Sequence, residues 1–173
     1  PVETVAGHRV LFVMATEAEY GPALRSRLRM FNCGVGPVEA GVAVAAALSS
    51  VPVDLVVSLG SAGSARLEHL GIYQVTEDAW RDVDASPLGI ARGITPFSGL
   101  PARLPLETWA ILRACMRIGV PLVGLRGISD GRAPLGGLSD WSAALPAIDR
   151  GLAQAVDDLA AALAGGDWGP GRG

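Results

Sequence analysis

The sequence predicts a single three-layer α/β/α domain with a central mixed, largely parallel sheet. Apolar runs of strand length alternate along the chain with longer segments of helical periodicity, an order that places helices on both faces of a sheet. The buried runs are near-continuous, which is typical of parallel strands covered on both faces. A length of 173 residues, of which 50% are apolar, is enough for one domain with a sizeable core.

The strands are predicted from short apolar runs that lead into small polar residues or glycine. The first is 9–15, and 53–60 is a second buried strand that leads into the segment SAGS. Residues 71–76 are a further candidate, and 120–129 form the last strand, directly before Asp130. Because ligands of open α/β folds bind beyond the carboxyl ends of the strands, the residues after 53–60 and 120–129 are expected to meet at one edge.

The helices are predicted from apolar residues at helical spacing, or from a run of alanines, over 16–28, 37–50, 106–119 and 139–166. Pro37 suits the first position of its helix, and the last helix ends in glycines. The stretch 85–105 is rich in proline and glycine and is expected to be irregular. The tail 165–173 is low in complexity, so the core of the domain is expected within 9–164.

Composition excludes several classes of function. The 14 basic residues are all arginine and scattered, and the net charge of -3 offers no basic surface for nucleic acid. The absence of lysine removes Schiff-base chemistry and a P-loop. The two cysteines have neither zinc nor disulfide spacing, which favours a reducing, cytoplasmic location. No secretory pattern and no apolar run of about 18 residues is present, so no membrane association is expected.

Five motifs have a structural interpretation beside a functional one. Thr16-x-x-Glu19 matches a helix capping box, Glu107 suits a helix start, and Asp130 suits an N-cap or an Asp-Gly turn. In NCGVGP (32–37), a G-x-G forms a tight turn or approaches a ligand closely. SLGSAGS (58–64) offers hydroxyls and backbone N–H groups, as turns and ligand loops both do. Taken singly, the three acids and NCGVGP favour the structural interpretation, and SLGSAGS stays open.

Taken in order, these motifs resemble the purine nucleoside phosphorylase and nucleosidase superfamily, and within it the 5'-methylthioadenosine/S-adenosylhomocysteine nucleosidases. The resemblance covers most of 9–164 and is most specific at GSAG after one strand and at SD after VPLVGLRGI. The similar segments are VMATEAEYGPAL, NCGVGPVEAGVAVAAAL, DLVVSLGSAGS, WRDVDASPLG, LETWAILRACMRIGVPLVGLRGISDG and the closing helix.

The resemblance implies the phosphorylase/hydrolase-like fold and a role for each acid. Asp130 matches the family's general acid, Glu19 its water-activating carboxylate and Glu107 its ribose-holding carboxylate. The implied reaction is hydrolysis of the N-glycosidic bond of a purine ribonucleoside such as 5'-methylthioadenosine, with no metal or organic cofactor. One carboxyl group must protonate the departing base while another activates water, so these residue types suit the reaction. The other residues expected to bind substrate are Ser61, Ala62, Gly63, Leu106 and Ser129.

Two alternatives stay open: phosphorolysis, and nucleoside binding without catalysis on the same fold. Phosphorylases need cations at the phosphate site, and NCGVGPVEA has none, whereas Glu19 would repel phosphate and suit water. Family members carry a further strand and a base-closing loop before the position of Leu106. Either this flap has been lost, which would favour the binding protein, or a segment is missing from the sequence; the second is favoured because losing a central strand would expose the core. The resemblance also implies a homodimer with 80–90 near the interface.

Overall fold

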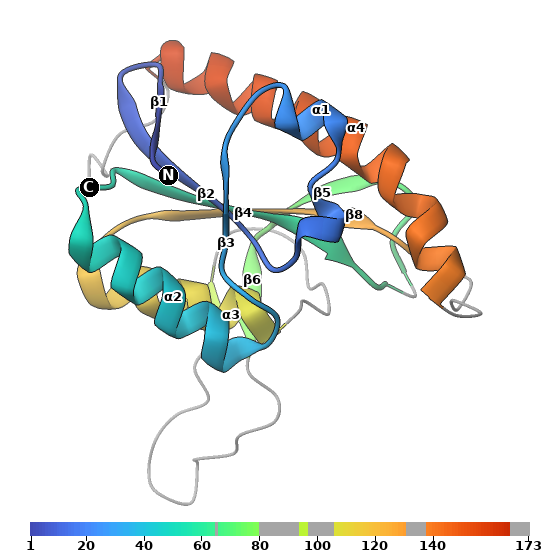
Figure 1. Cartoon of the computed structure of the whole chain (residues 1–173), viewed down its shortest axis with the longest axis horizontal. Coiled ribbons are helices and arrows are strands. Elements are labelled where there is room, and N and C mark those ends of the chain that lie inside the picture. Colours follow the sequence, from blue (N-terminus) through green and yellow to red (C-terminus); the bar gives the residue numbers. More distant parts are fainter. Residues whose placement is uncertain (65, 80–93, 97–105, 131–137, 167–173) are drawn as a thin grey trace, which may run out of the picture.

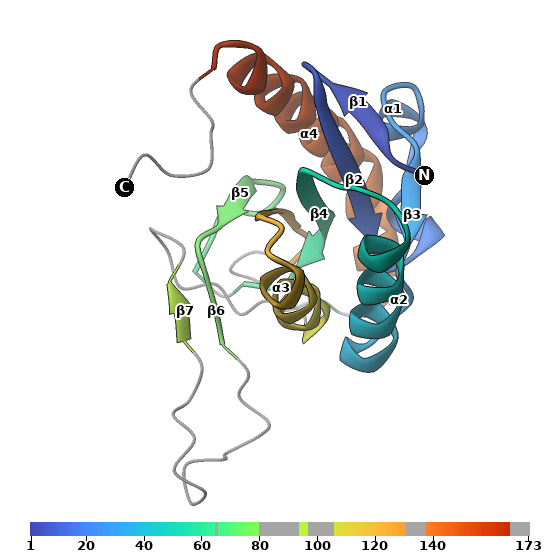
Figure 2. The ribbon, with the colours of Figure 1, turned by 90° about the vertical axis from the view of Figure 1, so that its left-hand side faces the viewer.

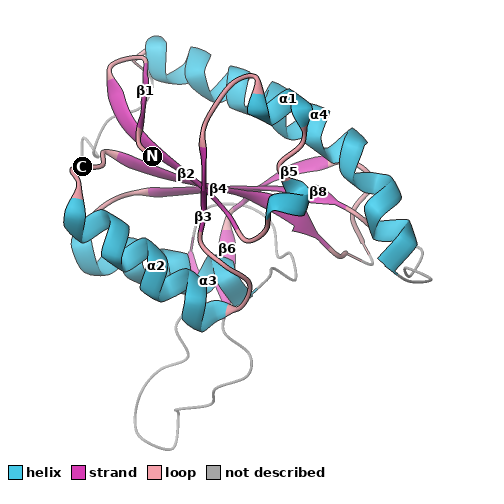
Figure 3. Ribbon diagram, in the orientation of Figure 1, coloured by secondary structure: helices cyan, strands magenta, loops and turns pink. Residues whose placement is uncertain are grey.

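The computed structural model describes residues 1–64, 66–79, 94–96, 106–130 and 138–166 (Figure 1). The described helices lie in two layers on opposite faces of one sheet, as the secondary-structure colouring of Figure 3 makes clear. Figure 2 shows α4 (Leu138–Ala164) on one side of the sheet and α2 (Pro37–Ser50) with α3 (Leu106–Ile118) on the other. The predicted three-layer α/β/α class is confirmed.

The central sheet has six described strands, four of which run parallel. Its order is β1-β2-β4-β8-β5, with β3 paired to β2, and β1 and β5 are antiparallel to their neighbours. A separate antiparallel pair joins β6 to β7. The bounds are β1 Glu3–Val5, β2 His8–Met14, β3 Met30–Asn32, β4 Leu55–Ala62, β5 Ile72–Val75, β6 Glu77–Ala79, β7 Ile94–Pro96 and β8 Leu122–Ile128. The four predicted strands correspond to β2, β4, β5 and β8.

Alternation along the buried strands divides the core into two halves. Val10, Phe12 and Met14 of β2 pack on the side of α4, where a first apolar cluster also takes in Ile148. The intervening residues of β2 belong to a second cluster, which holds the buried faces of α2 and α3. Strands buried on both faces need apolar residues at successive positions, which explains the continuous run in the sequence.

The prediction of one helix over 16–28 is wrong. The segment contains a 3₁₀ turn, η1 (Glu17–Glu19), and a separate short helix, α1 (Pro22–Arg25). Pro22 has no N–H and disfavours helical backbone at Gly21, so it starts α1 and prevents a continuous helix. Gly21 must also lack a side chain, because a Cβ there would lie 2.4 Å from the carboxyl carbon of Asp149.

The stretch 85–105, expected to be irregular, contains the short strand β7. The rest of that stretch, the tail from 167 and the chain immediately before Leu106 lie outside the described residues. The missing base-binding segment therefore stays a prediction.

Asp149 of α4 binds the start of α1, although the two helices are far apart in the sequence. Its side chain is buried, and its two carboxylate oxygens accept hydrogen bonds from the backbone N–H groups of Ala23, at 2.8 Å, and Leu24, at 3.1 Å. These N–H groups lie in the first turn of α1, so a residue of another helix supplies the N-terminal cap. The cap fixes the segment that follows η1.

Asp149→Ala is expected to lower the free energy of unfolding by about 2 kcal/mol, because two backbone donors lose their acceptor. Urea denaturation measures this loss as a lower midpoint at unchanged slope. Asp157→Ala is the matched control on the same helix, since its exposed ion pair with Arg27, at 3.0 Å, is expected to contribute less than about 1 kcal/mol. Equal losses in the two variants would show that the cap contributes no more than a surface carboxylate.

Candidate active site

The carboxyl ends of β4 and β8 lie side by side, as the sequence predicted. The two parallel strands pair Ser61 with Gly127 and Ala62 with Ile128. The backbone N–H of Ser129 then donates to the carbonyl of Ala62 at 3.0 Å. The segments SAGS and ISD therefore leave the sheet at one edge.

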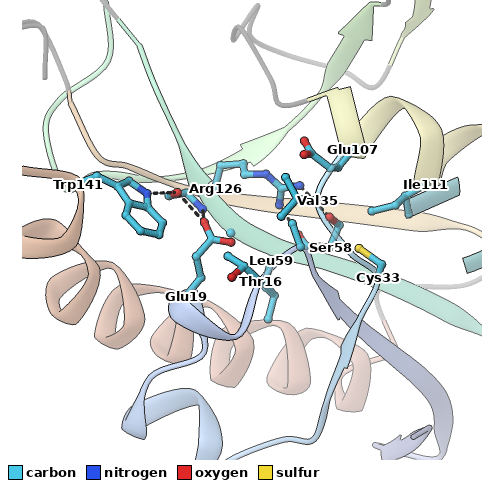
Figure 4. Close-up of a pocket in the computed structure, with 13 residues that line it drawn as sticks. Thr16, Glu19, Cys33, Val35, Ser58, Leu59, Glu107, Ile111, Arg126 and Trp141 are labelled. Atoms are coloured by element: carbon cyan, nitrogen blue, oxygen red, sulfur yellow. Dashed lines mark hydrogen bonds between the residues drawn. The ribbon is translucent and has the colours of Figure 1, made fainter. Parts of the chain in front are cut away.

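A cavity of about 370 Å³ opens at this edge (Figure 4). Its walls come from η1, the loop between β3 and α2, strands β4 and β8, and the first turns of α3 and α4. The polar and charged side chains that line it are Thr16, Glu19, Cys33, Ser58, Ser61, Glu107, Arg126 and Trp141. Three of the predicted site residues, Glu19, Ser61 and Glu107, thus share one cavity.

Glu19 is buried and binds Ser61 rather than its own turn. Its Oε1 accepts hydrogen bonds from the Ser61 backbone N–H at 2.7 Å and from the Ser61 hydroxyl at 2.6 Å. The capping-box interpretation is therefore wrong for the carboxylate of Glu19. Thr16 is nevertheless the N-cap of η1, because its hydroxyl accepts from the Ala18 N–H at 3.3 Å. The family resemblance assigned Glu19 to the site, and the structure places this residue at the cavity. Its catalytic role stays a prediction.

Glu107 joins α3 to the glycine loop before α2. Its Oε1 accepts a hydrogen bond from the Gly36 N–H at 2.8 Å. Gly34 and Gly36 have φ of 82° and 96°, a region in which other residues are strained. The tight-turn interpretation of NCGVGP is therefore correct. The turn also serves the site, because Val35 at its centre lines the cavity.

Asp130 lies at the same sheet edge but is not among the residues that line this cavity. Its Oδ1 accepts a hydrogen bond from the Ser64 N–H at 2.9 Å. A Cβ at Gly63 would stand 2.8 Å from its Oδ2, so glycine allows this close approach. Gly131, the partner in the expected Asp-Gly turn, lies outside the described residues.

The remaining predicted site residues surround these acids. Ala62 and Ser129 are buried and do not line the cavity, and the Ser129 hydroxyl lies 3.4 Å from the carbonyl of Ala62. Gly63 is exposed beside Asp130. Leu106 begins α3 next to Glu107, but its side chain lies outside the described part.

Arg126 is a site residue that the sequence analysis missed. Its guanidinium is buried between β4 and α3, where it donates to the Ser58 carbonyl and hydroxyl, both at 2.8 Å, and to the Thr108 hydroxyl at 2.6 Å. The cavity thus holds one cation beside two carboxylates, although NCGVGPVEA carries no basic residue. The sequence feature that could have indicated it is an arginine within an otherwise apolar strand. Buried charged residues are rare unless they are paired, so such an arginine is expected to have specific partners.

Cys33 and Trp141 also line the cavity and were not assigned to it from the sequence. Burial raises the pKa of the Cys33 thiol to about 11, and the nearby charge of Glu107 adds to the shift. The thiol is therefore neutral at pH 7 and adds no charge to the site. The Trp141 indole N–H donates to the Ser61 hydroxyl oxygen at 3.0 Å.

No protein-family model matches the sequence, and neither does any curated protein. Solved structures do match. The nucleosidase of Colwellia psychrerythraea, in complex with adenine, superimposes with a TM-score of 0.69 at 18% identity over 89% of this chain and 95% of its own. The chain has the fold of the 5'-methylthioadenosine/S-adenosylhomocysteine nucleosidases. The Arabidopsis thaliana methylthioadenosine nucleosidase superimposes with a TM-score of 0.69 at 14% identity, over 90% of this chain and 96% of its own. The Neisseria meningitidis enzyme in complex with methylthio-immucillin-A superimposes with a TM-score of 0.64 at 20% identity, over 87% of this chain and 99% of its own.

The nucleosidase fold confirms the predicted resemblance at the level of architecture. Among the described residues, no group of three or more histidine, cysteine, aspartate or glutamate side chains is placed to hold a metal ion. None of the described helices is both long and apolar enough to span a membrane.

Proposed function

We propose that the protein hydrolyses the N-glycosidic bond of a purine ribonucleoside, 5'-methylthioadenosine or S-adenosylhomocysteine, and releases adenine. The observation that carries this proposal is the convergence of Glu19, Glu107 and Asp130, far apart in sequence, on one sheet edge of a nucleosidase fold. The structural interpretation of each acid, as a helix cap or a turn residue, explains that acid alone. It does not explain why all three lie at the same edge.

The proposed reaction uses the three carboxyl groups in different ways. A water oxygen bonds to the anomeric carbon of the ribose while the bond from that carbon to the base nitrogen breaks. Glu19 accepts the proton of the water, and Asp130 donates a proton to the departing base. Glu107 accepts hydrogen bonds from the ribose hydroxyls, and its charge favours the positive charge that develops on the sugar.

The charges of the cavity favour water over phosphate as the nucleophile. Arg126 is its one described cationic lining residue, and its guanidinium already donates to Ser58 and Thr108. Glu19 and Glu107 add two negative charges to the same cavity, and a phosphate dianion would be repelled by both. Arg126 nevertheless weakens the sequence argument against phosphorolysis, which rested on the lack of basic residues in NCGVGPVEA.

Release of adenine from a panel of purine nucleosides, measured with and without phosphate, tests the proposal. Phosphate-independent release from 5'-methylthioadenosine or S-adenosylhomocysteine is the expected result. Release that requires phosphate would assign the protein to the phosphorylases. Binding of a nucleoside without any release by the folded protein would favour a nucleoside-binding protein on the same fold.

We infer that the protein is a homodimer in which α2 contacts a second copy. Three valines at the start of α2 and just before it, Val35, Val38 and Val42, are exposed by 69%, 70% and 66%. Val35 also lines the cavity, so the apolar surface continues into the site. A second copy of the chain would cover these valines and narrow the mouth of the cavity. The loop 80–90, which the sequence placed near the interface, lies outside the described residues.

The two buried, unbridged cysteines, Cys33 and Cys115, fit the expected cytoplasmic location.

Light scattering at micromolar concentration is expected to give the mass of a dimer for the wild type and of a monomer for the double variant Val38→Glu/Val42→Glu. The two added charges on each copy would be buried unpaired between the helices. Ala161→Glu is the control, because this exposed residue lies on α4, on the other face of the sheet. A dimeric double variant, or a monomeric wild type, would rule out this interface.

A further inference from the structure

Trp141 lies in the first turns of α4, 80 residues along the chain from Ser61, and its side chain lines the cavity. The proposed reaction assigns it no role. Its indole N–H donates to the oxygen of the Ser61 hydroxyl, which in turn donates to the Glu19 carboxylate; dashed lines in Figure 4 mark these bonds. The Ser61 hydroxyl thus lies between an aromatic donor and a buried carboxylate.

The chemistry of these groups sets the direction of the two hydrogen bonds. An indole N–H can only donate, and an ionised carboxylate can only accept. With Trp141 donating to the Ser61 oxygen at 3.0 Å, the Ser61 hydroxyl proton is directed to Oε1 of Glu19 at 2.6 Å. That distance is typical of a hydroxyl bound to a charged carboxylate. Hydrogen bonds in such a chain polarise one another, so the indole strengthens the contact between Ser61 and Glu19.

The chain of bonds also distinguishes the two oxygens of Glu19. Oε1 takes both the Ser61 hydroxyl and the Ser61 backbone N–H. Both oxygens lie close to Gly60, where a Cβ would come within 3.3 Å of Oε2 and 3.4 Å of Oε1, but no described residue donates a hydrogen bond to Oε2. A carboxylate held through one oxygen leaves the other in a fixed place to accept a proton.

We propose that Trp141 is a positioning residue for Glu19 and acts through the Ser61 hydroxyl. The proposal rests on the proposed function, since it assigns Glu19 the activation of water. If so, the indole N–H affects the rate of adenine release only while residue 61 has a hydroxyl group. An aromatic ring that merely filled space at the start of α4 would not depend on Ser61 in this way.

A double-mutant cycle on kcat for adenine release tests this dependence. Trp141→Phe removes the N–H and keeps an aromatic ring, whereas Ser61→Ala removes the hydroxyl and keeps the backbone N–H that binds Glu19. Each is expected to lower kcat about threefold to tenfold, the effect of one lost hydrogen bond. The double variant is expected to be no slower than Ser61→Ala alone, and Ser61→Thr, which restores a hydroxyl, is expected to recover part of the rate. Losses that multiply in the double variant would overturn the proposal.

A measurement on the resting protein separates this inference from the proposed function. The indole N–H resonance of Trp141, identified by its disappearance in Trp141→Phe, is expected to shift upfield in Ser61→Ala and to stay near its wild-type position in Ser61→Thr. An unmoved resonance in Ser61→Ala would overturn the hydrogen-bond chain even if the wild type is active. A wild type that shows the shift but releases no adenine would overturn the function, and with it the positioning role, while leaving the chain of bonds in place.

Discussion

Asp130→Asn is expected to lower kcat for adenine release by about 10²–10⁴-fold, the usual contribution of a general acid. An asparagine has nearly the shape of aspartate, and its Oδ1 can still accept the hydrogen bond that the Ser64 N–H makes at 2.9 Å. It has no carboxyl proton to give to the departing base. The variant should therefore fold and bind nucleoside but turn it over slowly, so KM changes much less than kcat.

Steady-state kinetics and equilibrium nucleoside binding on the same preparation check this expectation. Asp157→Asn makes the same chemical change at an exposed site on α4 and is expected to keep wild-type turnover. Because Asp130 does not line the described cavity, this variant is also the sharpest test of its role. Wild-type activity in Asp130→Asn would remove it from the mechanism, and activity lost together with binding would assign it to substrate binding.

Glu19→Gln is expected to lower kcat by a similar factor, about 10²–10⁴, because the proton acceptor for water is lost. The amide oxygen of glutamine can still accept from the Ser61 N–H and hydroxyl, which lie 2.7 Å and 2.6 Å from Oε1 in the wild type. The atom that replaces Oε2 is then an NH₂ group, which donates hydrogen bonds and cannot take up a proton. The geometry is kept while the chemistry is removed.

Glu17→Gln, two residues away in the same 3₁₀ turn, is the matched control. Glu17 is exposed and its carboxylate pairs with Arg25 at 2.7 Å, so its loss is expected to leave kcat unchanged and stability within about 1 kcal/mol. Single-turnover measurements of adenine release, with thermal unfolding to verify the fold, compare the two. Glu19→Gln with turnover within a factor of about three of the wild type would exclude Glu19 as the base, since general-base catalysis contributes far more.

The architecture could be predicted because it depends on patterns that are local in sequence. Continuous apolar runs at β2, β4 and β8 can only be satisfied by burial on both faces, which requires helices above and below a parallel sheet. That arrangement alone brings Ser61 and Asp130 to one edge. Through the family resemblance, the order of the motifs then assigned three acids to this edge, of which Glu19 and Glu107 line the cavity and Asp130 does not. Their roles stay predictions.

Local patterns misled wherever the partner of a side chain is distant in the chain. Thr16-x-x-Glu19 has the local pattern of a capping box, but the Glu19 carboxylate binds Ser61, 42 residues away. The break between η1 and α1 follows locally from Pro22, but its cap comes from Asp149, more than 120 residues further on. Neither partner can be found by spacing on a helix or a strand.

Arg126 is the clearest example of a residue whose burial could be predicted from the sequence and whose partners could not. The apolar residues that surround it in 120–129 are enough to predict that this arginine lies in a buried strand. Its place in the lining of the cavity, with Glu19 and Glu107, could not be predicted in this way, because Ser58 of β4 and Thr108 of α3 must first be brought to its guanidinium. Burial follows from the local hydrophobic pattern, whereas the partners that satisfy a buried charge are supplied by elements that meet only when the chain folds.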